Sequence, residues 1–399
     1  MTQGTPPSRP RKRTGPLVAG ALLVLLAFGL AGFTVWQVFF SAEGGAESPE
    51  AAVTELFEAG AEQDGVAALR LLNPDEVRGA DEVWESVQER MDDAEMVEDG
   101  EVTGTHIAVE DVDVEVEELS DHAAKVTVTG GIVAVTVDVD QLPPRLADLA
   151  EGAAGEQGST YTEEMQLVEI RELLDLPADP FLIAIEDDGR WFVSPTATVA
   201  EYVALATTGH GGDWSAYEAG LERDPATAAE PEEALSVLAD SFALDDLHGF
   251  ADALPPGQAA VLRPYLGFLE DALLDEGLPE LRASFDGADV AAGAERDGLV
   301  RLDLEQVRFD LAAVGSTGGS AAGLDGMCGW AESISGQRVE GCLPEEVARA
   351  TGEDNVFVMV RETAGGWQLD PLATVIAWSD AAVRHISSED LEALLQLVA

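Results

Sequence analysis

An internal repeat constrains the fold of this chain more than any other feature of its sequence. Residues 48–53 (SPEAAV) return as residues 230–235 (EPEEAL) at an offset of 182. Residues 189–199 return as residues 365–375 at an offset of 176, with Gly, Trp and Pro at matching positions and Ala-Thr-Val at the end. The same start and the same end, in the same order, indicate a tandem duplication whose second copy is six residues shorter.

Each copy begins with helical periodicity and continues with a period of two residues. In copy one, Ser48 is expected to cap a helix that starts at Pro49, and further helices are expected over 66–72 and 75–92. Helices followed by an antiparallel sheet are typical of the α+β class. The strands expected in copy one are 109–116, 126–128, 132–139, 165–174, 181–186 and 191–193. In copy two, helices are expected over 231–243, 246–254 and 258–285, and strands over 288–293, 299–311, 356–361 and 367–369.

A run of 24 residues without a charged side chain, residues 17–40, precedes the repeat. At about 1.5 Å per residue, a helix of this length spans roughly 36 Å, more than the ~30 Å core of a bilayer. A cleaved secretory signal is the alternative, but its apolar region is usually only about 7–15 residues long, and bulky Phe39 stands where cleavage needs a small residue. We therefore expect one uncleaved transmembrane helix in the cell membrane, with the N-terminus cytoplasmic and the later residues extracytoplasmic. Its cytoplasmic flank is basic, with Arg9, Arg11, Lys12 and Arg13.

These observations predict a division of the chain into seven segments. Copy one is expected to be one domain, residues 48–207, and copy two a second domain, residues 230–385. The remaining segments are a cytoplasmic tail (1–16), the transmembrane helix (17–40), two linkers (41–47 and 208–229) and a C-terminal amphipathic helix (386–399).

The charge is divided by the apolar run. The chain has a net charge of −56, and because residues 1–40 hold four basic groups and no acidic one, residues 41–399 carry −60. A surface this acidic repels phosphates, which excludes a nucleic-acid partner. Excess carboxylate maintains solubility, as in a salty habitat, and this interpretation is favoured over the alternative, attraction of a cationic or envelope protein partner.

The chain has two cysteines, Cys328 and Cys342, both in the part expected outside the membrane. In an oxidising compartment, two cysteines within one glycine-containing stretch favour a disulfide, worth about 3 kcal/mol for a loop of this length. A metal site would need more ligands, and a redox pair is usually spaced as Cys-x-x-Cys.

The fold-determining motifs of copy one resemble a known family. They are the opening at 48–53, the Asp64-Gly65 helix break, the Leu-Leu-Asn-Pro helix end at 71–74 and the closing hairpin at 189–195. The chain resembles the extracytoplasmic NTF2-like (cystatin-like, cone-shaped α+β) domains of membrane-anchored or lipid-anchored proteins from high-GC Gram-positive bacteria. The resemblance covers about 47–207 and 230–381 and implies a curved sheet wrapped around helices, with a cavity in each cone. Since the family includes enzymes and binding modules, the resemblance implies no particular activity.

The sequence carries no established catalytic or cofactor motif, and we predict no catalytic residue, cofactor or metal. The string Glu110-Asp111-x-Asp113-x-Glu115 could offer calcium ligands, but its alternation with valines is typical of the exposed face of a half-buried strand. His122 is expected in a solvated turn. Trp191 and Trp367 recur with the whole closing hairpin, which favours core packing over a ligand platform.

Two insertions are expected at the same loop of the two copies, at 151–159 and at 315–326, the second being a flexible Gly-rich loop. The sequence favours a non-enzymatic binding or scaffold role at the cell envelope. The alternative is an enzyme of the ketosteroid-isomerase-like kind acting on a small apolar molecule, which would need an Asp or His base inside an apolar cone cavity. No ligand and no oligomeric state follow from the sequence.

Overall fold

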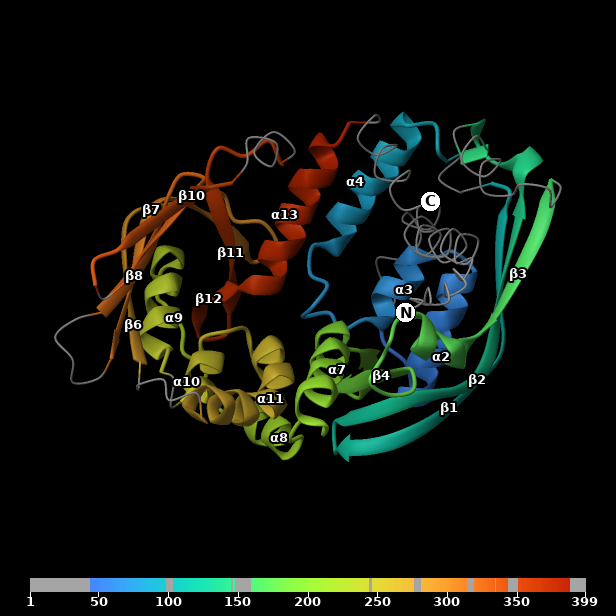
Figure 1. Cartoon of the computed structure of the whole chain (residues 1–399), viewed down its shortest axis with the longest axis horizontal. Coiled ribbons are helices and arrows are strands. Elements are labelled where there is room, and N and C mark those ends of the chain that lie inside the picture. Colours follow the sequence, from blue (N-terminus) through green and yellow to red (C-terminus); the bar gives the residue numbers. More distant parts are fainter. Residues whose placement is uncertain are drawn as a thin grey trace, which may run out of the picture.

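The protein, described by a computed structural model, is an α+β molecule with helices and curved antiparallel sheets (Figure 1). The structure describes residues 44–97, 103–144, 146–147, 159–243, 246–275, 281–313, 319–333, 335–343 and 351–387. The expected transmembrane helix and its basic flank lie outside these residues, as does nearly all of the expected C-terminal helix. Within the described part of the chain, every helix is too short or too polar to cross a bilayer.

Copy one begins with three helices, as its periodicity predicts. Ser48 caps the first helix by accepting a hydrogen bond from the Ala51 backbone N–H, and Asp64 caps the second in the same way. The elements of copy one are α2 (Pro49–Ala61), α3 (Gly65–Leu71), α4 (Ala80–Asp93), β1 (Thr105–Ser120), β2 (Ala123–Asp138), η1 (Val139–Gln141), β3 (Thr160–Gln166), η2 (Leu167–Glu169), α6 (Ile170–Leu173), β4 (Phe181–Asp187), β5 (Arg190–Val193) and α7 (Pro195–Thr208).

Copy two follows the same order of elements after a connecting helix, α8 (Ser215–Leu221). Asp246 caps its second helix as Asp64 does in copy one, at the predicted offset of 182. Its elements are η3 (Pro231–Glu233), α9 (Ala234–Ser241), α10 (Leu247–Asp252), α11 (Pro256–Asp275), β6 (Leu281–Ala292), β7 (Leu299–Ala313), β8 (Gly319–Asp325), β9 (Cys328–Glu332), β10 (Arg338–Cys342), β11 (Val356–Thr363), β12 (Gly366–Asp370) and α13 (Pro371–His385).

The two sheets share their strand order and their register. Copy one is ordered β1-β2-β4-β5 with β3 beside β2, and copy two contains β6-β7-β11-β12 with β8 beside β7. Ala123 pairs with Ile185 in copy one, and Leu299 pairs with Arg361 in copy two, each shifted by 176. Outside the named strands, Ala46 bridges to Trp191 and Ala228 to Trp367, so the closing tryptophans hold the chain that enters each copy.

Both sheets bend at an equivalent bulge. The β1–β2 register shifts between Glu110 and Asp113, and the β6–β7 register shifts between Gly287 and Asp289, at the same offset of 176. A bulge bends a strand and increases its twist, which curves each sheet around its helices. In copy one the bulge lies opposite Gly131, whose φ of +120° favours glycine. A Cβ at this position would also lie only 2.8 Å from the Leu167 side chain.

The helices lie between the two curved sheets, and each copy packs its last helix on the third helix of the other (Figure 1). Helix α13 of copy two lies along α4, and α7 of copy one lies along α11. Helix α8 also packs on α11. The two copies therefore form one body through reciprocal contacts.

A buried cluster of apolar side chains lies under β1 and β2 of copy one and includes Met91, Met96, Ile107, Val137 and Leu167. In copy two, Leu235, Leu302 and Val360 are buried at the positions of Val53, Val126 and Ala184, which form a second buried cluster of copy one. Trp191 and Trp367 are half-buried and pack against the cores of copy one and copy two.

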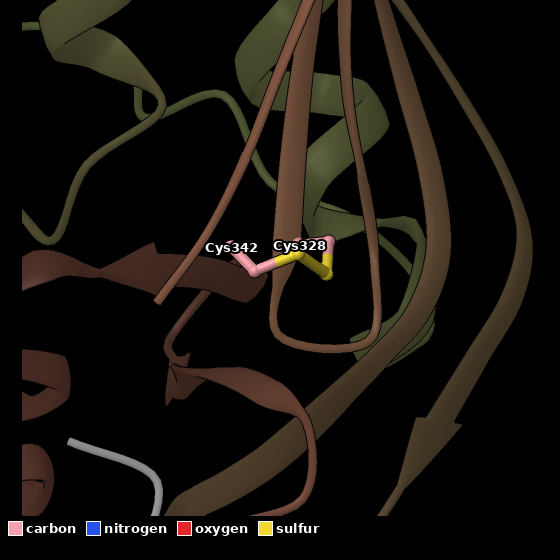
Figure 2. Close-up of a disulfide and its surroundings, with 2 residues drawn as sticks. All are labelled: Cys328 and Cys342. Carbon is pink, nitrogen blue, oxygen red and sulfur yellow. A yellow bond between two sulfur atoms is a disulfide. The ribbon is translucent and has the colours of Figure 1, made fainter. Parts of the chain in front are cut away.

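The structure contains the predicted disulfide between Cys328 and Cys342 (Figure 2). The two cysteines face each other across the β9–β10 hairpin, an addition to the copy-two sheet. Trp330 of β9 lies between the guanidinium groups of Arg308 and Arg338, 5.5 Å and 4.2 Å from its ring centre. All five residues of β10 are exposed, so the covalent bond holds a strand that buries little surface.

Several of the predicted elements differ in detail from the structure. The strand expected over 165–174 ends at Gln166, where pairing with β2 reaches the bulge, and Glu169 then accepts from the Gln166 backbone N–H at the start of a helical turn. The helix expected over 258–285 ends at Asp275, and Phe285 lies instead in strand β6, where it pairs with Phe309 of β7. The same apolar run suits a buried helix or a buried strand, and periodicity does not separate them.

The Gly-rich stretch 315–326, expected to be a flexible loop, contains strand β8. Its small residues are required by packing, since a Cβ on Gly323 would lie 2.7 Å from the Trp330 ring. The segment 208–229, expected to be a linker, contains α8. The expected third helix of copy one starts at Ala80 instead of Asp75, because the residues before it form a turn that contacts copy two.

Replacing both cysteines by alanine is expected to loosen the β9–β10 hairpin alone. The chain-entropy model assigns about 3 kcal/mol to a loop of this size, and the exposed β10 has little burial to replace it. Hydrogen exchange of the full chain should show faster opening of β9 and β10 amides and unchanged β11 and β12 amides. Equal protection of β9 and β10 with and without the disulfide would contradict this expectation.

Candidate functional site

A pocket of about 240 Å³ lies where the two copies meet, and we call it the inter-copy pocket. Copy one contributes the β4–β5 hairpin and the turn before α4, copy two contributes α10 and the start of α11, and α8 with the residues after it closes one side. Its lining residues are Asn73, Asp75, Ile185, Glu186, Asp187, Tyr217, Gly220, Leu221, Arg223, Pro225, Asp252, Leu254, Pro256, Gly257, Ala259, Ala260 and Arg263.

The local sequence explains how the pocket walls are positioned. Asp188 and Gly189 have φ values of +50° and +78°, which makes the predicted tight turn between β4 and β5 and places Asp187 at its start. Tyr217 is 3% exposed and packs its ring near Trp214, with ring centres 5.8 Å apart. Because Trp214 also meets Tyr265 of α11 edge to face, α8 holds a fixed position against copy two.

Three residues of the pocket lining, Asp252, Arg223 and Arg263, form an ion cluster, in which Arg263 Nε is a buried donor without a hydrogen-bond partner in the described part of the chain. Asp252 accepts from Arg223 Nε at 2.8 Å, from Arg223 Nη2, and from Nη2 of the buried Arg263. Burial alone would raise the pKa of Asp252, but the hydrogen bonds and positive charges of Arg223 and Arg263 outweigh burial and lower it. Asp252 is therefore an ionised partner for both guanidinium groups.

Asp187, also in the pocket lining, has acidic side chains near it. Burial raises the pKa of the Asp187 carboxyl, and the negative charges of Asp188 and Asp75 raise it further. Burial also raises the pKa of Tyr217, followed by the charges of Glu218, Asp187 and Glu76, so its hydroxyl stays protonated. Asp187 itself is exposed to solvent at the end of β4.

Beside the pocket, a buried ion pair joins the copies. Arg361 of β11 donates to Asp370 Oδ2 at 2.6 Å and to Asp75 Oδ1 at 2.5 Å, and Asp75 belongs to copy one. Gln258 donates to Asp370 Oδ1 at 2.7 Å and to the Asp75 carbonyl at 3.3 Å. Arg361 and Asp370 are 6% and 0% exposed, so the pair is shielded from water. We call these four residues the inter-copy node.

Copy one contains the equivalent of the Gln258–Asp370 contact, with the carboxylate on the other residue of the pair. Glu76 and Ser194 stand at the positions of Gln258 and Asp370, and Ser194 donates to Glu76 Oε1 at 2.5 Å. Ser194 and Asp370 also cap the last helix of their copy. Ser194 accepts a hydrogen bond from the Ala197 backbone N–H, and Asp370 accepts one from the Ala373 backbone N–H. Each of the two contacts, Glu76 with Ser194 and Gln258 with Asp370, therefore contains one carboxylate.

A second polar contact crosses between the copies at α7 and α11. Glu201 of α7 is 1% exposed and pairs with Lys125 at 3.0 Å. Its other oxygen accepts from the Tyr265 hydroxyl of α11 at 3.2 Å and from the Gly212 backbone N–H at 3.0 Å. The buried carboxylates Glu76, Glu201 and Asp370 are therefore all engaged in structural hydrogen bonds.

An apolar groove of about 490 Å³ runs beside this contact, between α7 and α11. Val199 and Val203 of α7 and Leu269 of α11 are 62%, 51% and 41% exposed along it. The groove is lined by apolar residues together with Thr196 and Tyr265, and no carboxylate, histidine, lysine or arginine is among its lining residues.

The residues singled out in the sequence do not form one site. Cys328 and Cys342 lie in the β9–β10 hairpin of copy two. Trp191 and Trp367 lie in different copies, where each pairs with the segment that precedes the first helix. The acidic string of β1 is exposed while its valines are half-buried, as expected for a strand with one wet face. Within the described residues, no three potential ligands gather as a metal site.

His122 makes a contact that its predicted solvated turn does not suggest. Its Nδ1 lies 3.0 Å from Glu218 Oε2 of α8, which ties the β1–β2 turn to the connecting helix. The inter-copy pocket was not predicted from the sequence. Asn73 and Asp187 belong to motifs that the sequence showed, but the lining residues meet only through contacts between distant segments.

The sequence and fold were compared with known proteins, and no family model, curated protein or solved structure matches the chain.

Arg361→Met is expected to lower the free energy of unfolding by about 3 kcal/mol, because it leaves the buried Asp370 charge without its cation. Adding Asp370→Asn should restore part of the loss, since asparagine can still cap α13 and carries no charge. Urea unfolding of the full chain measures both. Arg338→Met, at an exposed ion pair with Glu340, is the control and should cost less than about 1 kcal/mol. Equal losses at the two arginines would contradict the account.

Asp187→Asn is expected to stabilise the unliganded protein slightly at neutral pH, by less than about 1 kcal/mol. A carboxyl whose pKa is raised in the folded state favours folding below its unfolded pKa and opposes folding as pH rises through the folded value. The gain should therefore disappear near pH 3, where both proteins carry a neutral side chain. Thermal unfolding at pH 3 and pH 7 measures the difference, with the exposed Glu164→Gln as control. A gain of the same size at both pH values would disprove the electrostatic explanation.

Proposed function

We propose that the protein is a binding or scaffold protein of the cell envelope, held by a membrane helix at residues 17–40 with the two copies extracytoplasmic. The two copies are proposed to be tandem NTF2-like domains. The order of helices and then a curved, bulged antiparallel sheet in each copy supports this assignment. The anchor proposal rests on the length and apolarity of residues 17–40 and on the basic residues before them.

One observation carries the proposal of a binding role: the inter-copy pocket is built from both copies and from α8. A ligand in this pocket would contact segments far apart in the sequence, and concave sites between domains are common places for binding. The buried carboxylates Glu76, Glu201 and Asp370 support a role without catalysis, because each is already engaged in hydrogen bonds that position helices or join the copies.

Site-specific photo-crosslinking in the protein's own membranes tests the proposed function. A photoreactive residue replaces Leu221, which lines the pocket and is 50% exposed, in the full-length chain. A matched probe replaces Glu164, which is exposed on β3 and is not among the pocket residues.

We expect the Leu221 probe to give a discrete adduct with an envelope component that the Glu164 probe does not give. Identical adducts at both positions, or no adduct at Leu221, would count against a binding role for the pocket. Recovery of only a chemically altered small molecule would instead indicate catalysis.

A further inference from the structure

The inter-copy pocket contains a buried hydrogen-bond donor that has no acceptor among the described residues. Arg263 of α11 lines the pocket and is 3% exposed. Its Nη2 donates to Asp252 and its Nη1 donates to the His248 carbonyl at 3.3 Å, but its Nε has no partner in the described part of the chain. Since buried polar atoms in native proteins nearly always have a partner, this donor calls for an acceptor from outside the chain.

Contacts on two sides hold this donor at the wall of the pocket. Asp252 and His248 of α10 hold the two terminal nitrogens of the guanidinium group, which fixes the plane in which the Nε–H lies. Gly220 of α8, also a lining residue, lies so close to the arginine that a Cβ there would be 2.5 Å from Nε. The donor is therefore in position before a ligand arrives, between the walls that α8 and α10 form.

The charges of the lining favour a neutral acceptor over an anion. Among the described lining residues, four carboxylates stand against two guanidinium groups: Asp75, Glu186, Asp187 and Asp252 against Arg223 and Arg263. Asp252 already lies between the two arginines and neutralises one of their charges. An anion would add to the excess of negative charge, and the net charge of −60 on residues 41–399 would repel it from a distance. A cation without an acceptor atom would leave Arg263 Nε unpaired.

The remaining walls set the size of the ligand. Ile185, Leu221, Leu254 and Ala260 bring apolar side chains to the pocket. Its volume of about 240 Å³ is below the roughly 300–1,000 Å³ of pockets for drug-sized molecules. A short aliphatic group fits this space. The carbonyl oxygen of an amide is an uncharged acceptor with two lone pairs, and its N–H groups can donate to a lining carboxylate, so an amide matches both kinds of polar group in the lining.

We propose that the inter-copy pocket binds a small neutral aliphatic amide. Its carbonyl oxygen accepts the hydrogen bond of Arg263 Nε, and its alkyl group lies against Leu221 and Leu254. The proposal rests on the binding role proposed above and names the ligand class. A peptide chain offers the same carbonyl group, but the small volume of the pocket favours a free small molecule.

Side-chain NMR of the full-length chain in detergent, labelled with isotopic arginine, tests the proposed contact. The Nε–H signal of Arg263, assigned by its proximity to the Gly220 α-protons, is followed while butanamide is added. We expect this signal to move to lower field and to saturate, because a carbonyl acceptor deshields the proton. The isosteric anion butanoate should bind at least about tenfold more weakly, since it adds a like charge to the carboxylates of the lining. The n-butylammonium ion has no acceptor and should leave the signal in place.

A capped alanine tripeptide carries the same carbonyl groups on a longer chain and separates the two sources of an amide. It should bind more weakly than butanamide, because the pocket has room for a short group only. Tighter binding of the tripeptide would assign the pocket to a peptide chain and overturn the proposal. Movement of the Arg263 signal with butanoate or n-butylammonium, and not with butanamide, would overturn it as well.

Three variants, titrated with butanamide by calorimetry, locate the site. Arg263→Lys keeps the positive charge beside Asp252 but removes the Nε donor, and should weaken binding by about tenfold or more, the scale of a hydrogen bond to a charged group. Leu221→Ala removes part of the apolar wall and should weaken binding several-fold, while the Arg263 signal still moves. Arg308→Lys, at an exposed ion pair with Asp310, is the matched control and should bind as the unchanged chain does.

Unfolding midpoints in the same buffer show which variants are folded. If Arg263→Lys does not fold, the titration of the unchanged chain and of Leu221→Ala still decides. Equal affinity of Arg263→Lys and the unchanged chain, or an Arg263 signal that butanamide does not move, would overturn the proposal. If no probe moves the signal while the Leu221 photo-crosslink persists, the ligand class is wrong and the binding role stands. If the crosslink is also absent, the proposed function fails with it.

Discussion

The buried contact between Arg361, Asp370 and Asp75 is the interaction on which the rest of the arrangement depends. It places a guanidinium group from the sheet of copy two between the cap of α13 and a turn of copy one, away from water. A buried charge of this kind is tolerated only when its partners are in place, so the node fixes how the two copies meet. The inter-copy pocket shares Asp75 with the node, and the contact of Tyr265 with Glu201 and Trp214 joins the copies at a second place.

The duplication explains both the likeness of the copies and the asymmetry of their interface. Strand order, register, bulge and helix caps recur at constant offsets. At the interface the equivalent residues differ: Ile185 lines the pocket where Arg361 forms the node. Within each copy the equivalent contact holds one carboxylate, Glu76 in copy one and Asp370 in copy two.

Local features of the fold were readable from the sequence, and contacts between the copies were not. Ser48 and Asp64 cap helices because their side chains act within three residues, and the turn at Asp188 and Gly189 needs only its own residues. The Gly-rich β8 was missed because its small residues accommodate Trp330, which comes later in the chain. Tyr217 and Asp187 meet in the pocket only through tertiary packing, so no spacing in the sequence could reveal them.

The reciprocal contacts predict that the two copies behave as one body. Hydrogen exchange of the full chain in increasing urea tests it most directly, with β2 amides reporting on copy one and β7 amides on copy two. If the node and the reciprocal helix contacts join the copies, both sets of amides should lose protection at the same urea concentration. Loss of protection in one copy at a clearly lower concentration, with the other still folded, would contradict the account.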